Sequence, residues 1–239
     1  MRSKKTGLKI IITFSVIALL AVAGFLLFVN TGYKADDYAL GMLVSDDTFQ
    51  VSETDYGLMF DGPGDSDVLV FYPGGRVEPE AYAPLLREFA ENGMDVCLVD
   101  MPLDLAVFGQ NKADEVIPLY DYENLYIGGH SLGGAMAALY ASEHPDVLDG
   151  VILLAAYPTA PLDDSLAEIV LVGSEDHVID WGKLEEGRQY SPSSFTEYVI
   201  DGGNHAQFGS YGAQRGDGTA SITQQEQVDQ TVNIVISSI

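Results

Sequence analysis

The chain has 239 residues and a formal net charge of −25 at pH 7, a length that suits one domain once an apolar N-terminal run is set aside. Its strong acidity argues against nucleic acid and anionic lipid head groups as partners, because a negative surface repels both. Cys97 is the only cysteine, so an internal disulfide is excluded. Its place in an apolar run predicts a buried side chain rather than a nucleophile.

The N-terminus carries an apolar run over residues 8–29, in which Lys9 is the only charged residue. As a helix rising 1.5 Å per residue, this run would extend about 33 Å, enough to cross a hydrocarbon core of about 30 Å. We therefore expect one transmembrane helix. Basic residues tend to stay in the cytoplasm, which places the N-terminus inside and the remaining chain outside. The basic residues that precede or open the run are Arg2, Lys4, Lys5 and Lys9.

A cleaved signal peptide is the alternative for this run, because Ala21-Val22-Ala23 has the small-x-small form of a cleavage site. The apolar residues that continue over 25–29 argue against cleavage, which normally leads into polar sequence. Either way the remaining chain is exported, anchored to the cell membrane in one case and secreted in the other. Its seven basic and 36 acidic residues give it a formal charge of about −29.

The rest of the chain reads as one α/β domain. Apolar runs of strand length alternate with longer segments of helical character, which predicts a mostly parallel sheet flanked by helices. We expect strands at 49–52, 57–60, 67–72, 95–99, 124–128, 150–156, 168–173 and 195–200. We expect helices at 80–92, 131–144 and 224–236, and a helix with a loop over 103–122. The predicted boundaries are a basic tail at 1–7, the transmembrane helix at 8–29, a connector at 30–47 and the domain at 48–239.

The motif with the clearest chemical meaning is Gly129-His130-Ser131-Leu132-Gly133, which fits G-x-S-x-G. This pattern is typical of a nucleophile elbow, a strained strand-to-helix turn that lifts the serine hydroxyl above a sheet. Five residues alone are weak evidence, and a serine that opens a helix can be an ordinary N-cap. Here the pattern follows an apolar strand and opens a helix rich in small residues, which favours Ser131 as a nucleophile.

A serine hydroxyl needs a base to remove its proton, and four histidines are available. His205 follows the last predicted strand in a glycine-rich loop, so sheet topology returns it to the carboxyl edge beside Ser131. His130 is part of the elbow turn itself, and His144 lies at the exposed end of a helix, so neither is preferred as the base. His177 directly follows a candidate acid. His205 is therefore the predicted base.

The acid that orients this base is expected after the preceding strand, where Glu175 and Asp176 are adjacent. Asp176 is preferred, because aspartate is the commoner choice and fits the G-x-x-D spacing that begins at Gly173.

The oxyanion formed in acyl transfer needs two backbone N–H donors. One is expected from Leu132, directly after the nucleophile. The other is expected from the loop after strand 67–72, where Gly75 is preferred and Gly74 and Arg76 stay open. Without the elbow, this Pro-Gly-Gly sequence would be read simply as a turn.

From about Thr48 to the C-terminus, the chain resembles the α/β-hydrolase family. The phrases YPGGRVEPEAYAPL, GGHSLGGAMAALYA and GGNHAQFGSYGAQ are similar to those of a compact, lidless bacterial group of membrane-anchored serine hydrolases. The resemblance implies a triad of Ser131, Asp176 and His205, with no organic cofactor and no metal. Only about ten residues, 158–167, separate the sixth strand from the seventh, where many relatives insert a helical lid. No HExxH motif or comparable histidine cluster occurs.

Together these features predict an extracytoplasmic serine hydrolase that cleaves an ester, thioester or related acyl bond through an acyl-enzyme on Ser131. Its expected partners are a small-molecule acyl substrate and, through the N-terminal helix, a membrane; nucleic acid is not expected. Two alternatives stay open. The same triad could transfer the acyl group to an alcohol or sugar, or the domain could be a surface binding protein that lost turnover, since fold does not guarantee chemistry.

Overall fold

The computed structural model describes the backbone of residues 2–239 and the side chains of residues 13–25, 27–29 and 31–239. The chain forms two compact units, which meet in sequence between Gly32 and Tyr33. Helix α1 (Arg2–Asn30) makes up most of the first unit. The membrane span predicted at 8–29 falls partly on residues whose side chains lie outside this description. Among the residues that are described, no helix is both long enough and apolar enough to cross a membrane.

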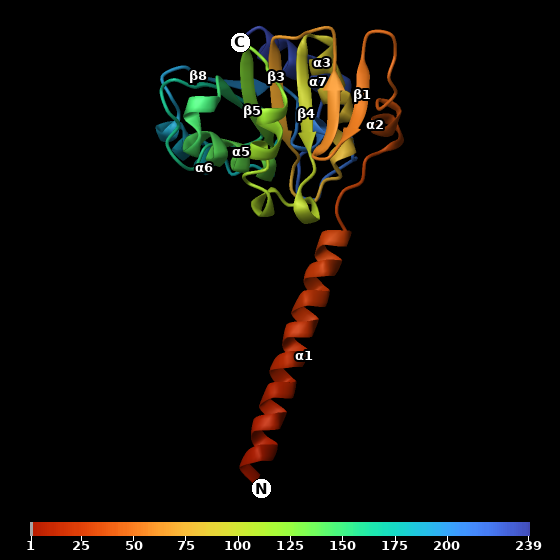
Figure 1. The fold of residues 1–239 in the computed structure, drawn as a ribbon, viewed down its shortest axis with the longest axis vertical. Coiled ribbons are helices and arrows are strands. Elements are labelled where there is room, and N and C mark those ends of the chain that lie inside the picture. The colour runs from red at the N-terminus through yellow and green to blue at the C-terminus, as the bar shows by residue number, and fades with distance from the viewer. Residues whose placement is uncertain (1) are drawn as a thin grey trace. The chain divides into compact units, whose positions relative to one another are not determined.

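The second unit is built on a sheet with the strand order β1-β2-β4-β3-β5-β6-β7-β8 (Figure 1). The six strands from β4 to β8 in this order run parallel, whereas β1 and β2 join the edge antiparallel. The prediction of a mostly parallel sheet is confirmed. The strands are β1 (Gln50–Thr54), β2 (Gly57–Asp61), β3 (Asp67–Tyr72), β4 (Met94–Val99), β5 (Asn124–His130), β6 (Gly150–Leu154), β7 (Ala167–Gly173) and β8 (Phe195–Ile200).

Helices cover both faces of this sheet (Figure 1). Side chains from α3 and α7 join one apolar cluster, and side chains from α5 and α6 join the other. Because β3 is covered on both sides, its sequence is a continuous apolar run, as buried parallel strands require. Alternate residues of β3 enter opposite clusters. The α-helices of this unit are α2 (Asp37–Gly41), α3 (Ala83–Glu91), α4 (Ala113–Val116), α5 (Leu132–Glu143), α6 (Trp181–Gly187) and α7 (Gln224–Ile236).

Several segments differ in detail from the sequence prediction. The helix expected at 80–92 begins as a 3₁₀ turn over Pro79–Tyr82, and α3 proper starts at Ala83 and ends before Gly93, whose φ is +96°. The stretch 103–122 forms α4 and three short 3₁₀ turns. Neither α2 nor α6 was expected, because each is shorter than two full turns and shows no apolar periodicity that a sequence can reveal.

The connector predicted at 30–47 packs largely within the second unit, which begins at Tyr33. Tyr33 pairs with the loop after β3, since its N–H donates to the Arg76 carbonyl at 2.7 Å and its carbonyl accepts from Glu78 N–H at 2.9 Å. At the carboxyl edge of the sheet, the described residues 155–166 lead from β6 to β7 without a helix. The carboxyl edge of the sheet therefore carries no helical insertion at that connection.

Candidate active site

Ser131 stands in the sharp turn between β5 and α5, with φ +53° and ψ −119°. A non-glycine residue at this φ is strained, and such strain is found where a site requires an unusual backbone. The turn is tight because Gly129 and Gly133 both lie against the backbone of Tyr72, at the end of β3. A side chain at either glycine would collide with that strand, which explains the glycines of the motif.

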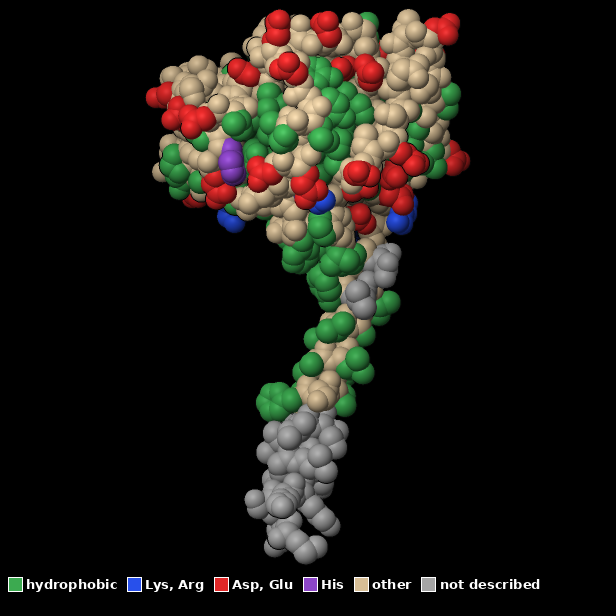
Figure 2. Space-filling view, in the orientation of Figure 1, with side chains coloured by type: hydrophobic (Ala, Val, Ile, Leu, Met, Phe, Trp, Pro, Cys, Tyr) green, Lys and Arg blue, Asp and Glu red, His purple; other side chains and the backbone are tan. Residues whose placement is uncertain are grey.

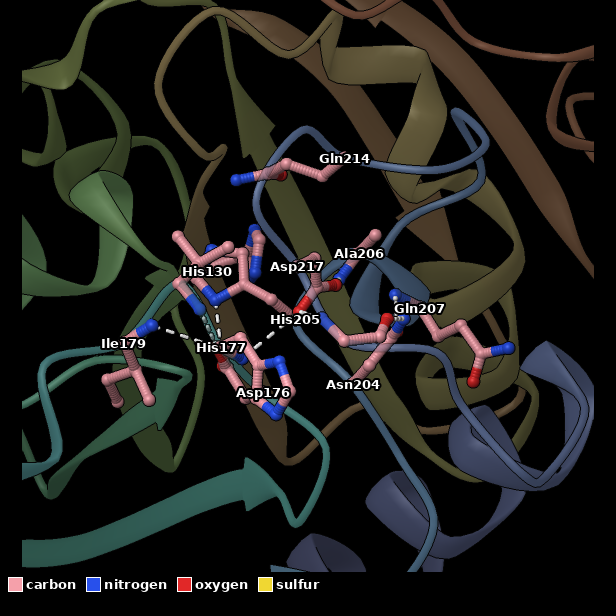
Figure 3. A network of polar contacts seen from close by, with 12 residues as sticks. His130, Asp176, His177, Ile179, Asn204, His205, Ala206, Gln207, Gln214 and Asp217 are labelled. Atoms are coloured by element: carbon pink, nitrogen blue, oxygen red, sulfur yellow. Dashed lines mark hydrogen bonds and ion pairs between the residues drawn. The ribbon is translucent and has the colours of Figure 1, made fainter.

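The predicted acid and base are in direct contact. Oδ2 of Asp176 lies 2.8 Å from Nδ1 of His205, and both side chains are buried (Figure 3). The other carboxylate oxygen of Asp176 accepts the backbone N–H groups of Val178 and Ile179, each at 2.8 Å. One oxygen is thus fixed by the loop that follows β7, and the second is left for the imidazole.

The outer nitrogen of His205, Nε2, is not the one that contacts Asp176. Nε2 is buried and has no hydrogen-bond partner among the described residues. His205 and Ser131 line the same cavity, of about 320 Å³. The remaining lining residues are mostly apolar: Leu132, Ala135, Ala155, Ala156, Tyr157, Thr159, Val178, Ile179 and Asp180.

Three other candidates, Glu175, His144 and His177, make no hydrogen bond to this pair in the described part of the chain. Glu175 is partly buried and accepts a long hydrogen bond of 3.4 Å from the Ser174 hydroxyl, without contact to His205. His144 stacks on Tyr140 with ring centroids 4.2 Å apart. The side chain of His177 is exposed.

The loop after β3 distinguishes the three candidates for the second oxyanion donor. The Gly74 N–H donates to the Tyr82 hydroxyl at 2.9 Å, and the Arg76 N–H donates to the Asp104 carbonyl at 2.7 Å. Within the described part of the chain, the Gly75 N–H makes no hydrogen bond. Leu132 is the first residue of α5, so its own N–H has no acceptor inside the helix. Two uncommitted donors therefore come from Gly75 and Leu132.

Sequence reasoning did not identify Tyr82, which links this loop to the elbow. Its hydroxyl lies 2.8 Å from Nδ1 of His130 and accepts from the Gly74 N–H. The ring of His130 lies 4.5 Å from the ring of His205, centroid to centroid. Burial and the neighbouring His205 lower the pKa of His130 well below its usual value, so its ring is neutral.

The described side chains include no group of three or more His, Cys, Asp or Glu residues that could hold a metal ion.

Comparisons with known proteins bear on the fold and the family. The sequence model of the alpha/beta hydrolase family matches residues 68–229. The chain is similar to the structure of a predicted CIB-like hydrolase from Thermoplasma acidophilum, with a TM-score of 0.56 and 16% identity over 79% of this chain and 99% of that chain. No curated protein sequence matches the chain.

Two further solved structures are equally similar. TT1662 from Thermus thermophilus has a TM-score of 0.56 and 14% identity, over 80% of this chain and 96% of that chain. Est1E from Butyrivibrio proteoclasticus has a TM-score of 0.56 and 13% identity, over 80% of this chain and 99% of that chain. At these identities the likeness concerns the fold alone. The family match extends over more than half of the sequence, and the chain therefore belongs to the alpha/beta hydrolase family.

Proposed function

We propose that the protein hydrolyses an ester, thioester or related acyl bond through an acyl-enzyme on Ser131. The observation that carries the proposal is the buried contact of Asp176 with His205, because His205 lines the same cavity as Ser131 and its Nε2 has no hydrogen-bond partner among the described residues. A base held in this way can remove the proton of a serine hydroxyl, and the aspartate stabilises the imidazolium that forms.

In the proposed reaction, Ser131 Oγ attacks the acyl carbon while His205 Nε2 takes its proton. The tetrahedral oxyanion is bound by the N–H groups of Leu132 and Gly75, neither of which donates to an acceptor among the described residues. His205 then protonates the leaving group, and the acyl-enzyme remains. Deacylation repeats these steps with water as the nucleophile, deprotonated by the same nitrogen.

The surroundings of the cavity favour an uncharged substrate with a short acyl chain. About 320 Å³ lies at the small end of the range for ligand pockets, and the walls beside Ser131 are small and apolar. Asp180 lies at the cavity, and acidic side chains are spread over the face seen in Figure 2, with few basic ones between them. Such a surface repels anionic substrates, including acyl groups carried on phosphorylated thiols.

The experiment uses the full chain in detergent with a fluorophosphonate probe and a p-nitrophenyl ester series from acetate to laurate. We expect covalent labelling of the wild type and the highest kcat/KM for the short esters. Ser131→Ala should lose both the labelling and the ester hydrolysis. Turnover in Ser131→Ala close to that of the wild type would refute the proposal. Product formed on an added alcohol at the expense of hydrolysis would instead identify an acyltransferase, and absence of labelling would favour a binding protein.

We further propose that the N-terminal segment anchors this domain outside a membrane. The proposal is supported by the apolar sequence of 8–29 and by the basic residues at its start. It is also supported by the exposure of large apolar side chains on α1, such as Phe14, Leu19 and Leu27. Protease added to intact cells should remove the domain and leave a small membrane-bound fragment. A mature protein that begins near Gly24 would instead indicate a cleaved signal peptide and secretion.

A further inference from the structure

The carboxylate of Asp217 connects the two loops that carry the acid and the base. Its Oδ2 accepts the backbone N–H of Ala206 at 2.9 Å, and its Oδ1 accepts the backbone N–H of His177 at 3.3 Å. Ala206 directly follows His205, and His177 directly follows Asp176. In Figure 3, Asp217 lies beside Ala206 on the loop that leads away from His205.

These two loops come from different strands. The acid loop follows β7 and the base loop follows β8, so their spacing depends on contacts between them. One such contact joins the Glu175 N–H to the Gly203 carbonyl at 2.8 Å, ahead of both catalytic residues. Asp217 provides a second contact between the loops, at the residues that follow Asp176 and His205 in sequence. The bond between Asp176 and His205 is thus held from both sides.

The carboxylate of Asp217 is suited to this role. It is partly buried, and its oxygens accept backbone N–H groups, including that of Gly218 at 2.8 Å. Hydrogen bonds from backbone N–H groups to an ionised carboxylate are stronger than those between neutral groups. The bridging bond to Ala206 has the length expected of such a bond, and the one to His177 is longer. Because both bonds end on backbone atoms, they fix the course of the chain at His177 and Ala206 rather than the rotamer of one side chain.

We propose that Asp217 is a positioning residue of the active site, which sets the spacing of Asp176 and His205 by bridging the residues that follow them. The inference rests on the proposed function, because it assumes that this pair acts on Ser131. Asp217 itself does not line the cavity. Its removal should therefore affect the chemical step and leave substrate binding unchanged, since misplacing a base by about 1 Å can lower a rate by about a hundredfold.

Asp46 offers a matched control. Its Oδ1 also accepts two backbone N–H groups, those of Thr48 at 2.9 Å and Phe49 at 3.0 Å. It lies before β1, and it does not line the cavity. Its Oδ2 also forms an ion pair with Arg87 at 2.6 Å, so Asp46→Asn weakens loop hydrogen bonds of the same kind and an ion pair, without touching the site.

The test compares wild type, Asp217→Asn, Asp217→Ala and Asp46→Asn as full chains in detergent. The measured quantities are kcat and KM for p-nitrophenyl acetate, the rate of fluorophosphonate labelling and the melting temperature. We expect Asp217→Asn to lower kcat and the labelling rate about tenfold, with KM within twofold of the wild type. Asp217→Ala should lower kcat further, because asparagine keeps one acceptor oxygen and alanine keeps none. Asp46→Asn should keep kcat within twofold, even where its melting temperature falls as much as that of Asp217→Asn.

If Asp217→Asn matches the wild type in kcat and labelling rate, the proposal is wrong. The same holds if Asp46→Asn loses activity to the same degree, because activity would then follow loop stability alone. Should Asp217→Ala fail to fold, the comparison of Asp217→Asn with Asp46→Asn still tests the proposal. Failure of the proposed function has a different signature, because wild type and Ser131→Ala would then be indistinguishable in labelling and turnover.

Discussion

Gly75 lies in contact with Leu132, the residue after the nucleophile. A Cβ atom built on Gly75 would come within 2.8 Å of Leu132 Cδ2 and 3.3 Å of Leu132 Cβ. Gly75 lies in the loop after β3 and Leu132 is the first residue of α5, and in the part of the chain that the structure describes the N–H of each makes no hydrogen bond. This contact places the two segments side by side, which is consistent with the proposal that both donate to a single oxyanion.

Gly75→Ala should therefore lower kcat about tenfold or more, with little change in KM. The variant keeps its N–H, but the added methyl group presses on the side chain of Leu132, the residue that carries the other proposed donor. Complete loss of one donor costs about a hundredfold to a thousandfold. Gly41→Ala is the control, because no atom lies within 4 Å of its added Cβ. Unchanged kcat in Gly75→Ala would mean that the second donor lies elsewhere.

The second prediction separates the adjacent carboxylates. Asp176→Asn should lower kcat by about a thousandfold or more, because the imidazole of His205 loses the group that orients and stabilises it. Glu175→Gln should change kcat less than about tenfold, because Glu175 makes no contact with His205. Steady-state kinetics of both variants decides the assignment. If Glu175→Gln loses activity and Asp176→Asn keeps it, the acid is Glu175 instead of Asp176.

The third prediction concerns the hydroxyl of Tyr82. Tyr82→Phe leaves the buried Gly74 N–H and Nδ1 of His130 without their shared partner. The free energy of unfolding should fall by about 1–3 kcal/mol, the usual cost of an unsatisfied buried polar group. Because Gly74 adjoins Gly75, kcat should fall as well. Chemical denaturation and steady-state kinetics provide the two measurements.

Tyr122→Phe is the matched control for this variant. It also removes a hydroxyl that makes a side-chain hydrogen bond, in this case to Asp95 at 2.6 Å. Tyr122 does not line the cavity of Ser131, so this variant should lose stability and retain kcat. Equal kcat losses in the two variants would contradict a specific role for Tyr82.

Local sequence was sufficient where one segment carries its own signal. The bounds of β3 and α7 agree with the prediction at both ends. β3 is an apolar run after its first residue, Asp67, and Pro73 and Gly74 follow its end. The N-terminus of α7 is fixed by a capping box, in which Thr223 and Glu226 bond each other's backbone N–H groups. The order of strands and helices then gave the α/β fold.

Other features depend on chain segments that meet only in the folded protein. Asp217 and Tyr82 belong to no sequence motif. The roles proposed for them follow from hydrogen bonds to distant residues: Asp217 accepts from a residue 11 positions away, and Tyr82 from one 8 positions away. The spacing rule placed Asp176 after β7, and the structure places it against His205. The catalytic roles themselves stay predictions. Sequence could not choose among Gly74, Gly75 and Arg76, because the choice depends on acceptors from Tyr82 and Asp104.

The last prediction concerns Glu168, a fully buried carboxyl on β7 that takes no part in the proposed reaction. Burial raises its pKa from 4.5 to about 7, although the Ser191 hydroxyl beside it favours the charged form. Between these values the folded state holds a proton that the unfolded state has lost, so the free energy of unfolding falls as the pH rises from 4.5 to 7. Glu168→Gln removes this charge and should be more stable than the wild type by about 3 kcal/mol at pH 8, with little difference near pH 4.5. Denaturant unfolding at both pH values measures the effect, and Glu53→Gln, at an exposed position on β1, should leave the pH dependence unchanged. If Glu168→Gln and the wild type lose stability in parallel between these pH values, then Glu168 is not the group responsible.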